Sequence, residues 1–351
     1  MSSGRKTGLL YAAAAALAGL DFALGVYAVY RAPFPLRVNL GSPTAYFNIY
    51  LHIPMAWATY LLYTGAFVSA LVYLIRGGEK WDRLVQAFVT LGTVYAVFTL
   101  VSGMAWASES WGAAWNWDPR ETAVLLLLLA YLVYFALRGS IPDPDRAATL
   151  SAAYAVAAYS MVPVSFVAPR LVQSLHPTAS SFGHFMGRPD VMAVFGPKVL
   201  LSSIVALLLA YLYAERLRGA AAPGWVRYVA AGFIVAGVAV GLVLASPYLS
   251  GGVERVAAAK LDSQGRIVSL TLVGPEGNRT VRLPSPVPSP VQPAVYEGKP
   301  TIVSHLVRVA GGRVEVVRHW SVALNAAAYP VIVGLVLLLL SRRPRQATGE
   351  H

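Results

Sequence analysis

Cysteine is absent from this chain of 351 residues. Disulfide bonds, thiolate nucleophiles, cysteine-ligated metals and thioether-linked cofactors are therefore excluded within it. Charge is also scarce, because 13% of the residues are Asp, Glu, Lys or Arg whereas 57% are hydrophobic. Such a composition is typical of a membrane protein and not of a soluble core. Any metal bound by this chain must be held by His, carboxylate, Met or Tyr.

Several catalytic signatures are also missing. The sequence has no glycine-rich phosphate loop with a lysine, no His-Glu-x-x-His and no carboxylates paired at catalytic spacing. The long apolar segments contain almost no acids, Asp21 being the main one, so we do not expect a proton-coupled transporter. The formal charge of +12 comes from Lys and Arg in short loops and not from one basic face. We therefore expect no nucleic-acid partner.

Hydropathy predicts an all-α polytopic membrane protein with about eight transmembrane helices. A bilayer crossing needs about 20 apolar residues. Segments near this length lie at 8–30, 50–75, 84–106, 121–138, 146–167, 194–217, 225–245 and 322–341. The first is longer than the core of a signal peptide and has no clear cleavage site, so we interpret it as a retained span.

The orientation in the membrane is predicted from the short loops. With the N-terminus in the cytoplasm, thirteen Lys and Arg residues of the short segments lie inside and six lie outside. Basic residues favour the cytoplasmic side. We therefore expect an integral, multi-pass protein of the plasma membrane, surrounded by membrane lipid, with both termini in the cytoplasm.

The segment 246–320 differs from the helices. Strand-like stretches lie at 253–260, 266–273, 279–283, 301–310 and 313–320, and the Pro-rich stretch 284–293 is interpreted as a loop or spacer. We predict a small extracytoplasmic β domain between the last two spans. The expected domains are a helix bundle over 1–245, the β domain over 246–320, and a last helix with a basic cytoplasmic tail over 321–351.

Four of the eight tryptophans lie within twelve residues, in the loop 106–121 between the third and fourth spans: Trp106, Trp111, Trp115 and Trp117. Indoles favour membrane surfaces, but an interfacial belt scatters them over many helix ends. We interpret Trp57, Trp81 and Trp225 as such a belt and the cluster as a platform for a large planar ligand. Gly112 allows either a close approach to that ligand or a tight turn.

The cluster ends in Asp118-Pro119-Arg120-Glu121, which predicts a helix start with Asp118 as N-cap and Pro119 at the first helical position. Capping alone accounts for these two residues. Arg120 lies beside the indoles on the outer side, where it can pair with a carboxylate of the ligand. Arg170 and Arg188 are weaker candidates for a second carboxylate.

Two outer histidines, His52 and His176, are candidate metal ligands. A lone histidine at this depth is more often hydrogen-bonded to a carbonyl, but two neutral imidazoles from different loops can provide both axial ligands of a haem iron. His184 is the rival of His176 for the second position. His305 and His319 are expected to be surface residues of the β domain.

The run Trp111-Gly-Ala-Ala-Trp-Asn-Trp-Asp118 resembles the tryptophan-rich "WWD" signature of haem-handling proteins in cytochrome c biogenesis. Together with Ile49-Tyr-Leu-His-Ile-Pro-Met-Ala-Trp57 and Ser174-Leu-His-Pro177, it resembles the CcmC family over roughly residues 45–217. The resemblance implies that His52 and His176 ligate a non-covalent, b-type haem. It also implies that the platform consists of Trp111, Gly112, Trp115, Trp117 and Asp118.

The resemblance implies haem delivery at the outer face to a haem chaperone of the CcmE type, with ABC transporter subunits of the CcmA/CcmB type as further partners. It implies no bond-making chemistry. This chain departs from the CcmC pattern in two ways. The family usually has six spans, whereas this chain has about eight predicted spans. In addition, Trp117-Asp-Pro-Arg-Glu-Thr122 resembles the CcsA/ResC type of cytochrome c synthase, which has about eight spans. A synthase (haem lyase) subunit is therefore the alternative, and a permease with a tryptophan belt is a third. The extra β domain is interpreted as a docking surface or a fused partner.

Overall fold

The computed structural model describes residues 3–33, 43–176, 183, 186–264, 266–274, 277–287, 294–296, 299–301, 305–311 and 313–342. In these residues, eight helical segments are long and apolar enough to cross a membrane, and they coincide with the eight predicted spans. The helices are α1 (Ser3–Arg31), α2 (His52–Arg76), α3 (Glu79–Ser110), α4 (Pro119–Ser140), α5 (Pro144–Ala158), α6 (Met161–Leu171), α8 (Pro189–Leu217), α9 (Val226–Leu249) and α10 (Trp320–Ser341). A 3₁₀ helix, η1 (Pro43–Tyr50), leads into α2.

Helices α5 and α6 together form one span that is interrupted at Tyr159 and Ser160. Pro163 lies in the first turn of α6. Because proline has no backbone N–H, it cannot donate to the carbonyl of Tyr159, and its ring disfavours a continuous helix through this point. The span therefore bends where the sequence places its proline.

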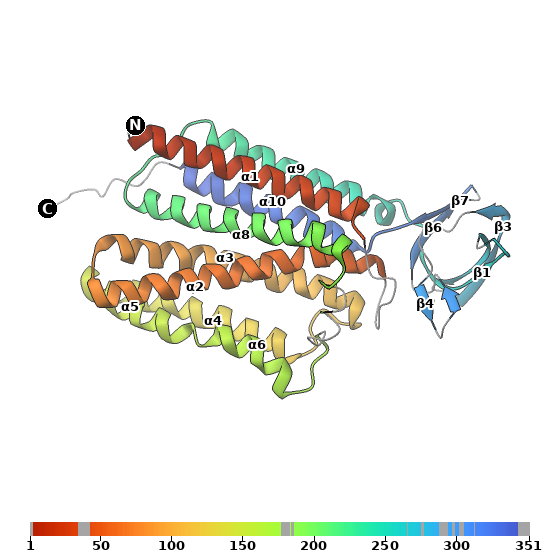
Figure 1. The fold of residues 1–351 in the computed structure, drawn as a ribbon, viewed down its shortest axis with the longest axis horizontal. Helices are drawn as coiled ribbons and strands as arrows, with labels where there is room; N and C mark the ends of the chain where they lie inside the picture. The colour runs from red at the N-terminus through yellow and green to blue at the C-terminus, as the bar shows by residue number, and fades with distance from the viewer. Residues whose placement is uncertain are drawn as a thin grey trace.

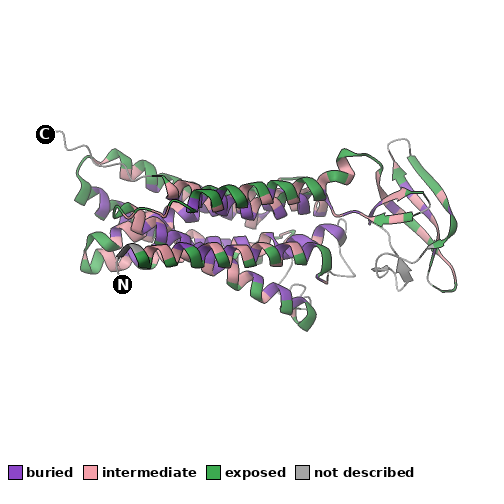
Figure 2. Ribbon diagram, turned by 90° about the horizontal axis from the view of Figure 1, so that it is seen from above, coloured by how far each residue is buried: buried purple, intermediate pink, exposed green. Residues whose placement is uncertain are grey.

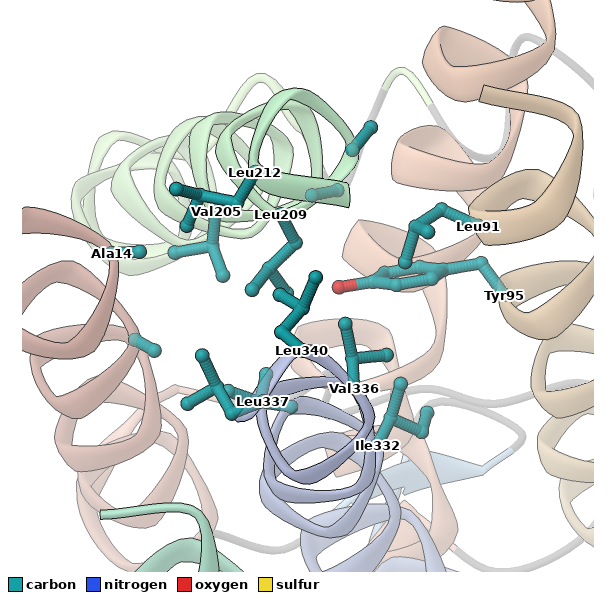
Figure 3. Packing of buried hydrophobic residues seen from close by; sticks show 14 of the residues in the cluster. Ala14, Leu91, Tyr95, Val205, Leu209, Leu212, Ile332, Val336, Leu337 and Leu340 are labelled. Carbon is teal, nitrogen blue, oxygen red and sulfur yellow. The ribbon is translucent and has the colours of Figure 1, made fainter. Parts of the chain in front are cut away.

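The helices run side by side, and the β strands lie beyond one end of the bundle (Figure 1). Their buried faces point inward and their exposed faces outward (Figure 2). One apolar core is built by residues of α1, α3, α8 and α10, whose side chains converge in Figure 3. A second core joins α2, α3, α4 and α5. The first turn of α1 and the last turn of α10 lie at the end away from the strands.

Glycines bring α9 and α10 into close contact. A Cβ at Gly334 would lie 2.7 Å from the carbonyl oxygen of Ala230, and one at Gly237 would lie 2.9 Å from that of Ala327. Small residues at a helix interface let two backbones approach, as is common in membranes. The two helices that flank the strands in sequence thus form one tightly packed pair.

Among the described residues, two ion pairs join helices of the bundle. Lys198 Nζ of α8 is 2.8 Å from a carboxylate oxygen of Asp21 of α1, and both side chains are buried. Arg138 donates two hydrogen bonds of 2.7 Å to Asp82. Asp21 is therefore buried as a paired acid, which is the form that a low-dielectric interior tolerates.

The strands are β1 (Val253–Leu261), β2 (Ile267–Gly274), β3 (Gly277–Val287), β4 (Ala294–Tyr296), β5 (Lys299–Thr301), β6 (Leu306–Ala310) and β7 (Arg313–Val316). Five of them form an antiparallel sheet in the order β3-β2-β1-β6-β7, and β4 pairs with β5. The two end strands β3 and β7 also contact each other. The predicted β segment is therefore a small barrel-like sheet.

The structure corrects three strand predictions. Residues 284–287, interpreted as loop or spacer, belong to β3; prolines are tolerated there because β3 is at the end of the strand order. The rest of that Pro-rich stretch, 288–293, lies outside the described residues. The stretch 301–310 is divided between β5 and β6, and the stretch 313–320 ends as a strand at Val316 because α10 begins at Trp320.

Candidate functional site

His52 is the first residue of α2, at the end of the bundle near the sheet. Its Nδ1 lies 2.7 Å from Ser102 Oγ of α3. That hydroxyl donates to the Thr99 carbonyl at 3.0 Å, so it accepts from His52 Nδ1–H. The lone pair of the imidazole is therefore on Nε2. Gly103 makes room for the ring, because a Cβ there would lie 3.1 Å from His52 Cε1, and the Trp106 ring packs edge-on at 5.9 Å.

His176 follows α6 in a segment without regular secondary structure. Its Nδ1 lies 2.6 Å from a carboxylate oxygen of Asp118. The other oxygen of Asp118 accepts from Ser174 Oγ at 2.6 Å and from the Leu175 N–H at 2.7 Å. Burial of Asp118 opposes its ionisation, but hydrogen bonds from His176 and Ser174 outweigh it and hold the pKa of this carboxyl well below its usual range. His176 thus donates Nδ1–H to the carboxylate of Asp118.

The loop that carries the tryptophans begins where α3 ends at Ser110. Gly112 has a φ of +82°, so it makes the tight turn that was one of its two predicted roles. Trp117 has a φ of +54°, which is unfavourable for a residue with a Cβ, and 75% of its surface is exposed. Trp115 packs edge-on against Trp117 at 5.7 Å, and Trp111 against the His176 ring at 4.8 Å. Strained backbone of this kind is concentrated at functional sites.

The predicted helix start is confirmed. Asp118 is the N-cap of α4 and accepts from the Arg120 N–H at 2.9 Å, with Pro119 in the first turn. Glu121 accepts from the Asn116 N–H at 3.0 Å and so fixes the loop from the helix side. Asp118 therefore has two roles, cap and partner of His176, of which sequence reasoning found only the first.

Arg120 is half-buried. Among the residues that the structure describes, its buried Nε has no hydrogen-bond acceptor, and neither has Nε1 of Trp106. Buried donors of this kind are rare in proteins unless a ligand or water satisfies them. The guanidinium is thus available for an anionic group, as the sequence predicts.

Other candidates are less suitable. Arg188 is engaged by Asp190, with a hydrogen bond of 2.6 Å, and Arg170 lies exposed at the end of α6. His184 lies outside the described residues. The interpretation of His305 and His319 as surface residues is wrong, since they are 1% and 5% exposed. His319 is the N-cap of α10, where its side chain accepts from the Ser321 N–H.

Both imidazoles contact the end of α3, where the Trp106 ring packs edge-on against His52 at 5.9 Å and the Trp111 ring against His176 at 4.8 Å. Each imidazole has Nδ1 within hydrogen-bond distance of an oxygen, which is the arrangement of metal-binding histidines with an outer hydrogen-bond partner. A shallow hollow beside them is lined by the tryptophan loop and by the segment that follows α6, including Trp117, Asp118, Ser174 and Leu175. Two loops distant in sequence thus meet at one site.

These features define a polytopic helical membrane protein with two histidines and a tryptophan-rich loop at one end of its bundle. The chain belongs to the CcmC family, described as heme exporter protein C, whose profile matches residues 5–221. That region contains His52, the tryptophan loop and His176, and it ends before α9. The resemblance predicted from the sequence motifs is confirmed.

The chain is also similar to individual proteins whose names place them in this family. The chain is 37% identical to heme exporter protein C of Rhodobacter capsulatus over 103 residues, which are 29% of this chain and 43% of that protein. It is 28% identical to the Escherichia coli K12 protein of the same name over 168 residues, 47% of this chain and 68% of that one. It is 23% identical to a ccmC-like mitochondrial protein of Marchantia polymorpha named for cytochrome c biosynthesis, over 56% of this chain and 78% of that one. The chain thus spans less than half of the length of the R. capsulatus relative.

Proposed function

We propose that this protein binds haem at the sheet end of its bundle and delivers it during the biogenesis of c-type cytochromes. The names of its relatives, which refer to haem export and to cytochrome c biosynthesis, support this function. The main observation behind this proposal concerns the two imidazoles. Each has Nδ1 hydrogen-bonded to an oxygen, which leaves Nε2 to bind a metal. Axial coordination of haem iron requires two such nitrogen atoms.

Each residue of the site has a proposed role. His52 and His176 hold the iron through Nε2, and Arg120 pairs with a haem propionate. Asp118 fixes the tautomer and orientation of His176. Trp111, Trp115 and Trp117 offer ring faces and edges to the porphyrin, with Gly112 turning the chain between them. The haem is non-covalent, because this chain has no cysteine for a thioether bond.

Delivery requires that one ligand can leave. His52 lies in the first turn of a transmembrane helix, whereas His176 is held outside regular structure by the Asp118 and Ser174 contacts. Because fewer backbone hydrogen bonds must break to move His176, we propose that it is exchanged first for a ligand of the acceptor. Trp117 in its strained conformation lies beside this segment.

We further propose that the site is extracytoplasmic, that both termini are cytoplasmic, and that residues 246–320 form an extracytoplasmic domain. The distribution of Lys and Arg supports this orientation, as does the position of the first turn of α1 and the last turn of α10 at the end away from the sheet. The proposed partners are a haem chaperone of the CcmE type and ABC transporter subunits of the CcmA/CcmB type.

A haem spectrum of the purified protein tests this function. We expect a low-spin, bis-imidazole signature in the wild type and its loss in both His52→Ala and His176→Ala, with His305→Gln as the control histidine variant. Retention of the wild-type spectrum in both alanine variants would refute the ligand assignment.

The alternative is a cytochrome c synthase subunit, which the eight spans and the Trp-Asp-Pro-Arg-Glu-Thr run favour. The match to the CcmC family favours delivery. Co-expression with an apocytochrome separates the two functions: covalent haem attachment by this chain without a chaperone would establish the synthase.

A further inference from the structure

A chain of buried polar side chains joins His52 to the β sheet by way of α10. We propose that Asn325 of α10 is a positioning residue for His52, and that through this chain the sheet controls how strongly His52 binds iron. The inference rests on the proposed haem site. It gives a role in that site to α10 and the sheet, which lie outside the region matched by the family profile.

Asn325 holds both elements that support His52. Its Nδ2 donates to Asn48 Oδ1 at 2.9 Å and to the Ser102 carbonyl at 3.3 Å. Asn48 is in η1, four residues before His52, and Ser102 accepts the Nδ1 proton of His52. A displacement of Asn325 therefore moves two groups together: η1, which leads into His52, and Ser102, which accepts the hydrogen bond from the imidazole.

The chain continues from Asn48 to the sheet. Asn48 Nδ2 donates to Ser321 Oγ at 2.7 Å, and that hydroxyl lies 2.8 Å from His319 Nδ1. His319 Nδ1 also accepts from the Ser321 N–H, so its proton is on Nε2, which lies 3.3 Å from Glu109. Arg255 of β1 binds both oxygens of Glu109, at 2.7 and 2.8 Å. From Asn325 through Asn48, Ser321 and His319, each residue directs one donor to the next partner on the way to Glu109, an orientation in which successive hydrogen bonds strengthen each other.

Burial makes this chain stiff. Asn325, Asn48 and Ser321 are 2%, 0% and 0% exposed, so water cannot replace a partner that moves away. An unsatisfied buried polar group costs about 1–3 kcal/mol, which favours concerted over independent movement of the members. A ligand-bearing element that is fixed in this way keeps a defined imidazole orientation.

The test uses the full-length wild-type protein in lipid nanodiscs, loaded with haem, and three variants: Asn325→Leu, Arg255→Met and the control Tyr329→Phe. The control removes a buried hydroxyl one turn along α10 that is not part of the chain. We measure haem affinity, the EPR spectrum and the reduction potential. Outer hydrogen-bond partners are worth roughly 10–100-fold in metal affinity, so we expect about tenfold weaker binding and a high-spin fraction in Asn325→Leu. Arg255→Met should show a smaller loss of haem affinity and a smaller high-spin fraction. Tyr329→Phe should match the wild type in both.

The outcomes are distinguishable. A wild type without a bis-imidazole signature overturns the proposed function and this inference with it. A wild type with that signature, and an Asn325→Leu protein with the same affinity and spectrum, overturns the positioning role alone. An unchanged Arg255→Met protein overturns the link to the sheet. If Asn325→Leu does not fold, Ser321→Ala cuts the same chain by removing a single hydroxyl, and wild-type behaviour in that variant overturns the inference.

Discussion

Replacing Asp118 by asparagine should weaken haem binding more than it weakens the fold. The carboxylate accepts from four donors: the Arg120 N–H and His176 Nδ1 on one oxygen, and Ser174 Oγ and the Leu175 N–H on the other. Asparagine has one acceptor oxygen. Whichever way the amide turns, its NH₂ group faces donors on one side, and either His176 or the Leu175 N–H loses its acceptor.

The size of the effect follows from these contacts. Hydrogen bonds to a charged group contribute about 1.5–3 kcal/mol each, and a buried donor left unsatisfied costs about 1–3 kcal/mol. Loss of an outer partner of a metal-binding histidine typically lowers metal affinity by roughly 10–100-fold. We expect the Asp118→Asn variant to bind haem roughly 10–100-fold more weakly than the wild type and to keep His52 as a ligand.

The assay is a haem titration of the purified protein, followed by absorbance and by EPR. The matched control is Asp143→Asn, because Asp143 is also an N-cap followed by proline, accepts from the Arg146 N–H at 2.7 Å and is exposed. Asparagine is as good an N-cap as aspartate, so this variant should behave as the wild type. Wild-type haem affinity in Asp118→Asn would refute the role of Asp118 as the partner of His176.

Three further predictions concern stability, each measured by thermal unfolding of the purified protein. Asp21→Asn leaves Lys198 charged and unpaired in the bundle and should destabilise it by about 3–5 kcal/mol. Burial and the nearby Arg255 lower the pKa of His319 to about 4; since the unfolded value is about 6.5, up to about 3 kcal/mol of stability should be lost as the pH falls from 6.5 to 4. Gly334→Ala pushes a methyl group into a carbonyl of α9 and should cost about 1–3 kcal/mol.

Each of these predictions has its own control. Lys198→Met added to Asp21→Asn should recover stability, and a double variant no better than the single one contradicts the ion-pair argument. Arg255 binds both oxygens of Glu109, the carboxylate that lies 3.3 Å from His319 Nε2. A pH slope that persists in His319→Gln contradicts the assignment of this slope to His319. The control for Gly334→Ala is Gly232→Ala, where nothing lies within 4 Å of the new Cβ, so its stability should equal that of the wild type.

The spans, the cap at Asp118 and the family were predictable because each depends on local pattern. The partner of His176 was not, because Asp118 lies 58 residues away and its Asp-Pro start is fully accounted for by capping. Ser102 and Gly103 are small residues in an apolar helix and gave no signal of a histidine beside them. Asn325, a single amide within the last apolar span, was the one visible clue, since buried polar residues in a membrane are expensive. The burial of His319 at the N-cap of α10 depends on tertiary packing, which no local pattern encodes.

The polar chain through Asn325 is not explained by stability. Replacing both partners of a buried hydrogen bond by apolar groups of similar shape is often neutral or stabilising. Replacing Asn325 by leucine, Ser321 by alanine and Asn48 by an apolar residue of similar shape would therefore let α10 pack against η1 at least as firmly, through the same apolar neighbours. What hydrogen bonds add is direction: an amide fixes the carbonyl of Ser102 and the side chain of Asn48 in single orientations, whereas apolar contacts tolerate rotation and sliding. Direction matters where an imidazole must present Nε2 to a metal, and His52 is the imidazole at which this chain ends.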